Sequence, residues 1–423
     1  MMTVIIAVST MIVLMVSLVS SFQFPMPLLS TSTLTSRVST STSTSQLFMA
    51  GFGAPAPSKK NIKKGGSNNK SKGETKKVNT TELKNKLLKK VTKMYGGTTP
   101  EEITKGTEKR IESMMSSEIK EAFVLRDVCQ QFDKRVSGMD FDTIRRKFSN
   151  EDIEIAVQNR DKYELYLTEN NLSPEKLQME MQRITWDASA TAKACKSLTG
   201  TMSTTFQNRV LKASQYAYDV CSSSSASEDD DDKVLDVGCG YGVTIPFLKK
   251  VGFRNKQIHG IDLSSEMIDY AKQFYPDIEV DGGKFIADDF YKIGRQQQDT
   301  TTTKYRSVLF CSALHDLPDM KTALLKTKNE LLDTTKIGSR IIIIHAQGAS
   351  HVQGQTKQNS LLVPRALPTT DELNDWLCDD NSNDSNDDNY NSSQIKMKLI
   401  VEPAESKSER EIREGYLAVL EII

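Results

Sequence analysis

The second half of the chain alternates short apolar runs with helical patterns, and this alternation restricts the possible folds more than any other feature. Five apolar runs are typical of buried strands, and loops and helical patterns separate them. The runs are 234–237, 258–262, 285–289, 308–311 and 340–344. Because parallel neighbours need a crossover between them, the pattern predicts an α/β fold with a parallel sheet.

Two more strand-like runs close the chain, at 395–401 and 416–422. The connection between them is too short for a crossover helix, so we expect this pair to be antiparallel.

Acidic residues follow three of the predicted parallel strands. In an open parallel sheet a ligand binds beyond the carboxyl ends of the strands, where Asp236, Asp262 and Asp288 lie. Asp262 can accept both hydroxyls of a ribose, Asp288 can accept an adenine amine, and Asp236 lies near any cationic group over the loop. Glycines in the loop after the first strand let the backbone turn and approach a ligand closely; they are Gly238, Gly240 and Gly242. The pattern predicts a positively charged nucleoside with no required phosphate.

From about Thr201 to Ile423 the chain resembles the class I S-adenosylmethionine-dependent methyltransferases. The resemblance implies a Rossmann-like seven-stranded sheet with a C-terminal antiparallel hairpin, and S-adenosylmethionine as cofactor. It also implies a set of cofactor contacts, namely Asp236, Gly238, Gly240, Gly242, Asp262, Asp288, Asp289 and Ser312. The run 312–317 follows the fourth strand, where many small-molecule members have a similar run. Arg306 departs from the family, whose members often have an acid entering that strand, and we expect this to affect local packing.

The main alternative by fold is a nicotinamide dinucleotide domain, since an acid after a glycine loop also serves that cofactor. The loop here is G-x-G-x-G, with Val243 at the next position, and Asp262 lies 24 residues after Gly238. The dinucleotide pattern instead has a third, later glycine and an acid about 20 residues further on. The spacing favours the methyltransferase interpretation.

Methyl transfer from a sulfonium needs alignment above all, and a base only when the acceptor is protonated. His315, at the end of the fourth strand, is the best candidate catalytic residue. His345 and His351 flank the stretch 347–368, which follows the fifth strand and is expected to form a substrate lid. His259 lies within a strand and is expected in the core.

The sequence favours a small-molecule acceptor. No Asn/Asp-Pro-Pro-Tyr/Phe run follows the fourth strand, and Lys plus Arg equals Asp plus Glu at 55 each, so a nucleic acid is not expected. The arginine methyltransferases' paired-glutamate loop is also missing. No metal site is expected, because the six cysteines are spread without a C-x-x-C pair. A catalytically inactive scaffold that binds the cofactor or a partner remains an alternative.

The segment 79–200 is expected to be helical, and it could cap the catalytic domain, bind a protein partner, or do both. Thr99, Pro100 and Glu102 predict the start of a long helix whose apolar stripe runs from Ile111 to Val124. Ser173 and Pro174 open another helix. The stretch 206–220 forms the last helix before the Ser- and Asp-rich gap at 222–232, within the sheet domain at 201–423.

The first residues are typical of targeting segments, since no Asp or Glu precedes Glu74. Residues 1–21 resemble a signal peptide, and 22–78 are rich in Ser and Thr and then in Lys, as in a disordered transit or linker segment. Together they resemble the bipartite plastid-targeting presequences of algae with secondary plastids. We therefore expect a plastid location with no stable membrane span after cleavage; secretion or an uncleaved signal anchor are alternatives.

Three low-complexity stretches precede strands and are expected to be solvated loops remote from the ligand. They are 222–232, 296–304 and 379–393.

Overall fold

The computed structural model describes residues 80–200, 202–222, 232–293, 303–358, 362–378 and 395–423. The segments 1–21 and 22–78 lie outside these ranges, and so does most of each low-complexity stretch. Within the described residues no helix is long and apolar enough to cross a lipid bilayer.

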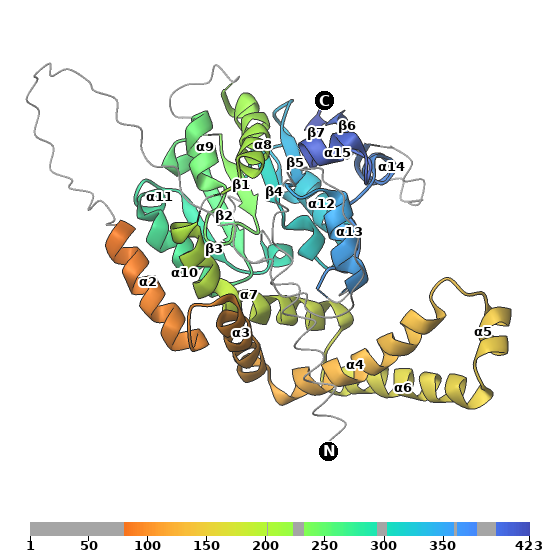
Figure 1. The fold of residues 1–423 in the computed structure, drawn as a ribbon. Helices are drawn as coiled ribbons and strands as arrows, with labels where there is room; N and C mark the ends of the chain where they lie inside the picture. The colour runs from red at the N-terminus through yellow and green to blue at the C-terminus, as the bar shows by residue number, and fades with distance from the viewer. Residues whose placement is uncertain (1–79, 201, 223–231, 294–302, 359–361, 379–394) are drawn as a thin grey trace, which may run out of the picture.

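Seven strands form one sheet in the order β3-β2-β1-β4-β5-β7-β6, which confirms the predicted α/β class (Figure 1). The strands are β1 (Val234–Val237), β2 (Ile258–Asp262), β3 (Lys284–Ala287), β4 (Ser307–Cys311), β5 (Arg340–His345), β6 (Met397–Val401) and β7 (Tyr416–Ile422). The first five are parallel, and β7 is antiparallel to both β5 and β6. The predicted antiparallel hairpin is therefore present, although its connection also contains a short helix, α15 (Glu409–Glu414).

Helices cover both faces of the sheet. Successive strand residues point to opposite sides, and because apolar residues occupy both sides, each face needs a layer of helices to bury it. On one face, Val234 and Leu309 pack with residues of α8 (Thr204–Ser222), α9 (Ile245–Val251) and α10 (Ser265–Phe274). On the other face, Leu235 and Phe310 pack with α12 (Met320–Lys326) and with residues of the N-terminal helices. Shorter helices complete the domain, namely α11 (Pro276–Val280), α13 (Ala349–Gln358) and α14 (Thr370–Leu373).

The N-terminal segment is helical as predicted, but its apolar stripe belongs to two helices. The helices are α2 (Thr80–Tyr95), α3 (Pro100–Met114), α4 (Ser117–Val136), α5 (Phe141–Lys147), α6 (Asn150–Glu169) and α7 (Pro174–Thr199). Thr99 and Glu102 form the expected capping box of α3. The predicted long helix is wrong beyond Met114, because Met115 adopts an extended backbone and the Ser116 side chain caps α4 by accepting from the Ile119 N–H. Ile111, Met115 and Ile119 nevertheless share one buried cluster.

Helix α7 joins the N-terminal helices to the sheet, and Figure 1 shows it lying along one edge of the sheet with α3 beside it. Met181 and Ile184 of α7 are fully buried in the cluster that also contains Leu235 and Phe310. The buried Asp187 carboxylate accepts from the Ser264 hydroxyl at 2.6 Å and from the Glu266 N–H at 3.3 Å. Residues on both sides of position 200 therefore share one core.

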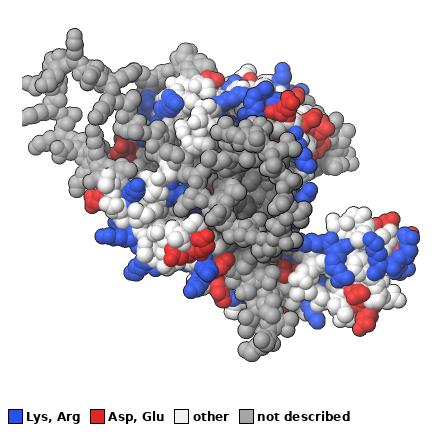
Figure 2. Space-filling model, viewed as in Figure 1, with Lys and Arg blue, Asp and Glu red and all other residues white. Residues whose placement is uncertain are grey.

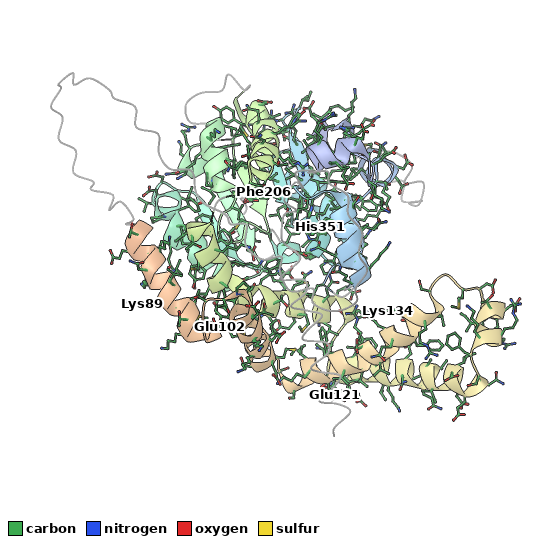
Figure 3. All side chains as sticks on the ribbon, viewed as in Figure 1. Lys89, Glu102, Glu121, Lys134, Phe206 and His351 are labelled. Atoms are coloured by element: carbon green, nitrogen blue, oxygen red, sulfur yellow. The ribbon has the colours of Figure 1, made fainter. Side chains whose placement is uncertain are left out.

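An arm formed by α4, α5 and α6 projects away from the sheet (Figure 1). Figure 2 shows that Lys and Arg gather over its far end. These residues are Lys134, Arg135, Arg145, Arg146 and Lys147. Figure 3 labels Lys134 in the last turn of α4 and Glu121 in its first half.

Arg306, the departure from the family pattern, has a structural role at the edge of the sheet opposite the carboxyl ends. Its buried guanidinium donates to the carbonyls of Lys336 and Ile337 at 2.8 and 3.0 Å and to the Ser339 hydroxyl at 2.9 Å. It also lies 3.5 Å from the Asp232 carboxylate.

Replacing Arg306 with Met is expected to lower the free energy of unfolding by about 3 to 5 kcal/mol, because buried acceptors lose their donor. Chemical denaturation measures this loss. Arg413→Met is the matched control, since the Arg413 side chain is 73% exposed. Equal stability of the two variants would contradict a structural role for Arg306.

Candidate functional site

A cavity of about 600 Å³ opens beyond the carboxyl ends of β1, β2 and β4. Seven of the residues predicted to contact a cofactor line it together, although they come from four strand ends. They are Asp236, Gly238, Gly240, Asp262, Asp288, Asp289 and Ser312. The sheet thus brings together residues that are up to 76 positions apart in the sequence, between Asp236 and Ser312.

The glycine loop is folded tightly against β2. The N–H groups of Gly238 and Cys239 both donate to the Ile261 carbonyl, at 2.8 and 3.0 Å. Gly238 has a φ of +67°, and a Cβ there would lie 2.4 Å from the Ala313 Cβ, so only glycine fits. Gly242 does not line the cavity; its φ is +86°, and a Cβ there would meet Ile245 and Tyr275 at 2.7 Å. The structure thus gives Gly242 a role in shaping the turn rather than in contacting a ligand.

Asp262 connects the glycine loop to the start of α10. One carboxylate oxygen accepts from the Gly240 N–H and the other from the Ser264 N–H, each at 2.8 Å. Each oxygen keeps a second lone pair that can accept from a ligand hydroxyl. Burial raises the pKa of Asp262 to about 6, although the two backbone donors oppose this shift.

Asp236 has one carboxylate oxygen without a partner. Its side chain lies beneath the glycine loop, and Oδ2 accepts from the Thr244 hydroxyl. Oδ1 is buried and has no hydrogen-bond partner. Burial raises the pKa of Asp236 to about 7. A buried carboxylate oxygen without a donor is costly, so a cationic or donor group of a ligand fits this position.

The remaining predicted contacts lie at the ends of β3 and β4. Asp288 accepts from the Asp289 N–H at 2.7 Å, and Asp289 accepts from the Tyr291 N–H at 2.9 Å. Ser312 has a φ of +55°, and its N–H donates to the Ile344 carbonyl at 2.8 Å. This left-handed residue turns the chain sharply after β4.

The predicted catalytic residue, His315, does not line the cavity. It is fully buried, its ring centroid lies 4.9 Å from that of His345, and His345 in turn stacks at 5.7 Å on His351 of α13. Figure 3 labels His351 on this helix. Burial lowers the pKa of His315 to about 3, so the ring is neutral at physiological pH. His259 is buried in the core, as expected, with Nδ1 3.1 Å from the Tyr305 hydroxyl.

The roof of the cavity comes from α2, α3 and α7, which we call the cap helices. Leu88, Ile103 and Trp186 are among the cap residues that line it, and Phe206 of α8, labelled in Figure 3, adds to the wall. From the predicted lid, 347–368, Gln347 alone lines the described cavity. Its Leu362 instead contacts α7, since the Leu362 carbonyl accepts from Gln182 at 2.7 Å. The cap helices therefore cover the site where the lid was expected.

Three charged residues of the cavity were not singled out from the sequence: Lys193 and Lys196 on α7, and Asp316 after β4. Asp316 could have been found, because it belongs to the run 312–317. The lysines carried no signal, since their position depends on how α7 packs. No group of three potential metal ligands occurs within the described part of the chain.

Residues 228–402 match the family described as "Methyltransferase domain". The match covers less than half of the chain and includes every predicted cofactor contact. No curated protein sequence matches the chain.

Several solved structures are similar to this chain. The plantazolicin methyltransferase BpumL in complex with SAH is 14% identical, with a TM-score of 0.33, over 52% of this chain and 85% of that one. The magnesium protoporphyrin IX methyltransferase from Synechocystis PCC 6803 is 16% identical, with a TM-score of 0.31, over 52% and 83%. Another BpumL complex is 18% identical, with a TM-score of 0.26. This match includes 37% of the present chain and spans only about half, 53%, of the BpumL chain.

The sheet order, the converging acids and the family match together define residues 228–402 as part of a methyltransferase domain of the class I type. S-adenosylmethionine is the cofactor that the sequence pattern and the sheet order imply for such a domain. The donor set fits this group, because the partnerless Asp236 Oδ1 suits a cation and Asp262 keeps free lone pairs for ribose hydroxyls.

Affinity for S-adenosylmethionine is expected to depend on pH. Burial raises the pKa values of Asp236 and Asp262 to about 7 and about 6, so both are partly protonated near neutral pH in the free protein. A cation binds the ionised forms better, so affinity is highest above pH 8 and falls about tenfold on going down to pH 6. Calorimetry with S-adenosylhomocysteine is the control, because it lacks the sulfonium charge and should show a smaller fall. An equal fall for both molecules would contradict the role of these acids.

Proposed function

We propose that the chain transfers a methyl group from S-adenosylmethionine to a small-molecule acceptor. The observation that carries this proposal is the position of the cavity: acids at the strand ends form one side, and the cap helices form the other. Its volume of about 600 Å³ lies in the range of small-molecule sites, roughly 300 to 1000 Å³. A nucleic-acid strand would instead need an open, basic channel.

The proposed mechanism is an in-line displacement in which the protein mainly positions the reactants. The sulfonium supplies the leaving group. Asp262 orients the ribose, Asp236 offers its partnerless oxygen to a cationic group, and the cap helices exclude water and hold the acceptor. Alignment of this kind can contribute roughly 7 to 11 kcal/mol in favourable cases.

The experiment is transfer of a deuterated methyl group from labelled S-adenosylmethionine. The full chain is incubated separately with a metabolite extract, with total RNA and with a denatured protein extract, and the label is located by mass spectrometry. We expect label in a compound of the metabolite fraction. Label confined to RNA or protein would overturn the small-molecule proposal, and no label in any fraction would favour the inactive scaffold.

We also propose that residues 1–78, which lie outside the described ranges, direct the protein to a plastid. The support is the absence of Asp and Glu before Glu74 together with the Ser- and Thr-rich stretch. A fluorescent fusion of residues 1–75, expressed in a diatom, is expected in the plastid. Fluorescence in the medium or along the secretory membranes would contradict this proposal.

A further inference from the structure

The cavity contains a further carboxylate, Asp316, that is not among the predicted cofactor contacts. Asp316 lies at the end of the short 3-10 helix Leu314–Asp316, which follows β4, and it lines the cavity although its neighbour His315 does not. Its carboxylate Oδ1 is 3.5 Å from His315 Nε2, and its backbone carbonyl accepts from Gln178 Nε2 of α7 at 3.4 Å. Asp316 therefore lies where the sheet side of the cavity meets the cap.

Lys193 faces the same space from α7. Its ammonium lies 4.5 Å from the centroid of the Trp186 ring, which is two turns earlier in α7, and Lys196 also lines the cavity. Many of the cap residues that line the cavity are apolar, and they include Leu88, Val91, Ile103 and Met179. This half of the cavity suits an apolar molecule, with charge confined to one place.

The charges around Asp316 come from three elements. Burial raises the pKa of Asp316 well above its usual value, Lys193 on α7 lowers it in part, and Asp262 at the end of β2 raises it further. The adjacent His315 is neutral, since burial and His351 lower its pKa. Burial and Lys196 lower the pKa of Lys193 to about 8, while Asp316 raises it. Asp316 and Lys193 are therefore electrostatically linked across the cavity.

We propose that the cap side of the cavity binds an apolar acceptor that carries a hydroxyl group, and that Asp316 takes the proton of this hydroxyl, with Lys193 as a positioning residue. The proposal rests on the proposed function and names its acceptor class. A carboxylate at this position can act as a general base. A general base is needed when the nucleophilic atom carries a proton, as a hydroxyl oxygen does.

The step balances without a further reactant. The hydroxyl proton passes to an Asp316 oxygen while the acceptor oxygen forms a bond to the methyl carbon. The bond between that carbon and sulfur breaks, and sulfur keeps the electron pair. The products are a methyl ether and S-adenosylhomocysteine, and Asp316 then releases its proton to solvent.

The first test needs no acceptor. Calorimetry of the full chain in buffers of different ionisation enthalpy measures the protons released on binding S-adenosylmethionine and, separately, S-adenosylhomocysteine. A sulfonium beside Asp316 favours its ionised form, so the sulfonium compound releases more protons. In Asp316→Asn this difference should fall by roughly one third, because one of three acids is removed and Asp236 and Asp262 remain. Asp269→Asn, an exposed acid on α10, is the control and should behave as the wild type.

Lys193 variants test the electrostatic link. In Lys193→Met the pH midpoint of the proton release should move upward by roughly one unit, because Asp316 loses its nearby cation. Lys193→Arg keeps the positive charge and should therefore restore the pH midpoint of the wild type. A purely structural role of Lys193 does not predict that the midpoint follows the charge. An unchanged difference in Asp316→Asn, or an unchanged midpoint in Lys193→Met with donor affinity intact, overturns the role of these residues.

The second test identifies the methylated atom. The deuterated methyl group of the labelled product should be on oxygen, and Asp316→Asn should form this product at least about 100-fold more slowly. Label on nitrogen, sulfur or carbon overturns the hydroxyl acceptor while leaving methyl transfer to a small molecule in place. Complete absence of labelled product in the wild type overturns the proposed function as well.

Discussion

Replacing Asp262 with alanine is expected to weaken S-adenosylmethionine binding by about 100- to 1000-fold. The change removes the carboxylate available to the ribose hydroxyls. It also leaves the N–H groups of Gly240 and Ser264 without their acceptor, each of which now bonds it at 2.8 Å. Because these two groups fix the glycine loop against α10, the preorganised shape of the donor site is lost together with the contact. Isothermal titration calorimetry measures the loss directly.

The control for this prediction is Asp269→Ala, which removes an exposed carboxylate from α10 seven residues later. Its donor affinity should match the wild type. Circular dichroism must show that Asp262→Ala is folded, since Asp262 also has a structural contact. Near-normal affinity of a folded Asp262→Ala protein would show that the ribose binds elsewhere.

Deleting residues 1–200 is expected to prevent the rest of the chain from folding cooperatively. The cap helices bury apolar side chains of the sheet, and Met181, Ile184 and Ala188 of α7 are fully buried in the same cluster as Leu235 and Phe310. Each large apolar side chain that becomes exposed costs about 1.5 to 3 kcal/mol, and several such losses exceed a typical domain stability of roughly 5 to 15 kcal/mol. Chemical denaturation and size-exclusion chromatography measure the outcome.

The matched control is a chain that begins at residue 79, which keeps every described helix. It should unfold in one cooperative transition. A soluble, cooperatively folded 201–423 fragment that binds S-adenosylmethionine would contradict the shared core.

The fold was largely predictable because strand runs and their order leave a strong local pattern. The runs at 234–237 and 258–262 are mostly apolar and carry an acid at or next to their last position, and the structure places them in adjacent parallel strands. The break between α3 and α4 was not predictable, because the apolar stripe continues through it and Ser116 carries only half of a capping box. Ile111 and Ile119 keep their shared environment although the helix is interrupted.

The donor side of the site was also visible in the sequence, since strand ends fix where their acids lie. Whether His315 or its neighbour Asp316 faces the cavity depends on the direction of the side chain rather than on its position in the sequence. The positive φ of Ser312 and the short helix after it point neighbouring side chains to different sides, so Asp316 reaches the cavity and His315 the core. Capping was one of the roles left open for 79–200, but the residues that make the cap contacts could not be predicted, because the contact between Asp187 and Ser264 joins residues 77 positions apart.

The two sides of the cavity come from separate stretches of the chain, and this separation has a practical consequence. The strand-end acids that line the cavity follow position 228, whereas the cap helices that line it precede this position. Under the proposed function, exchanging residues of the cap helices that line the cavity should change which compound is methylated without changing which methyl donor is used. The N-terminal helices are therefore the part of the chain in which to change the selectivity for the acceptor while the methyl-donor site stays the same.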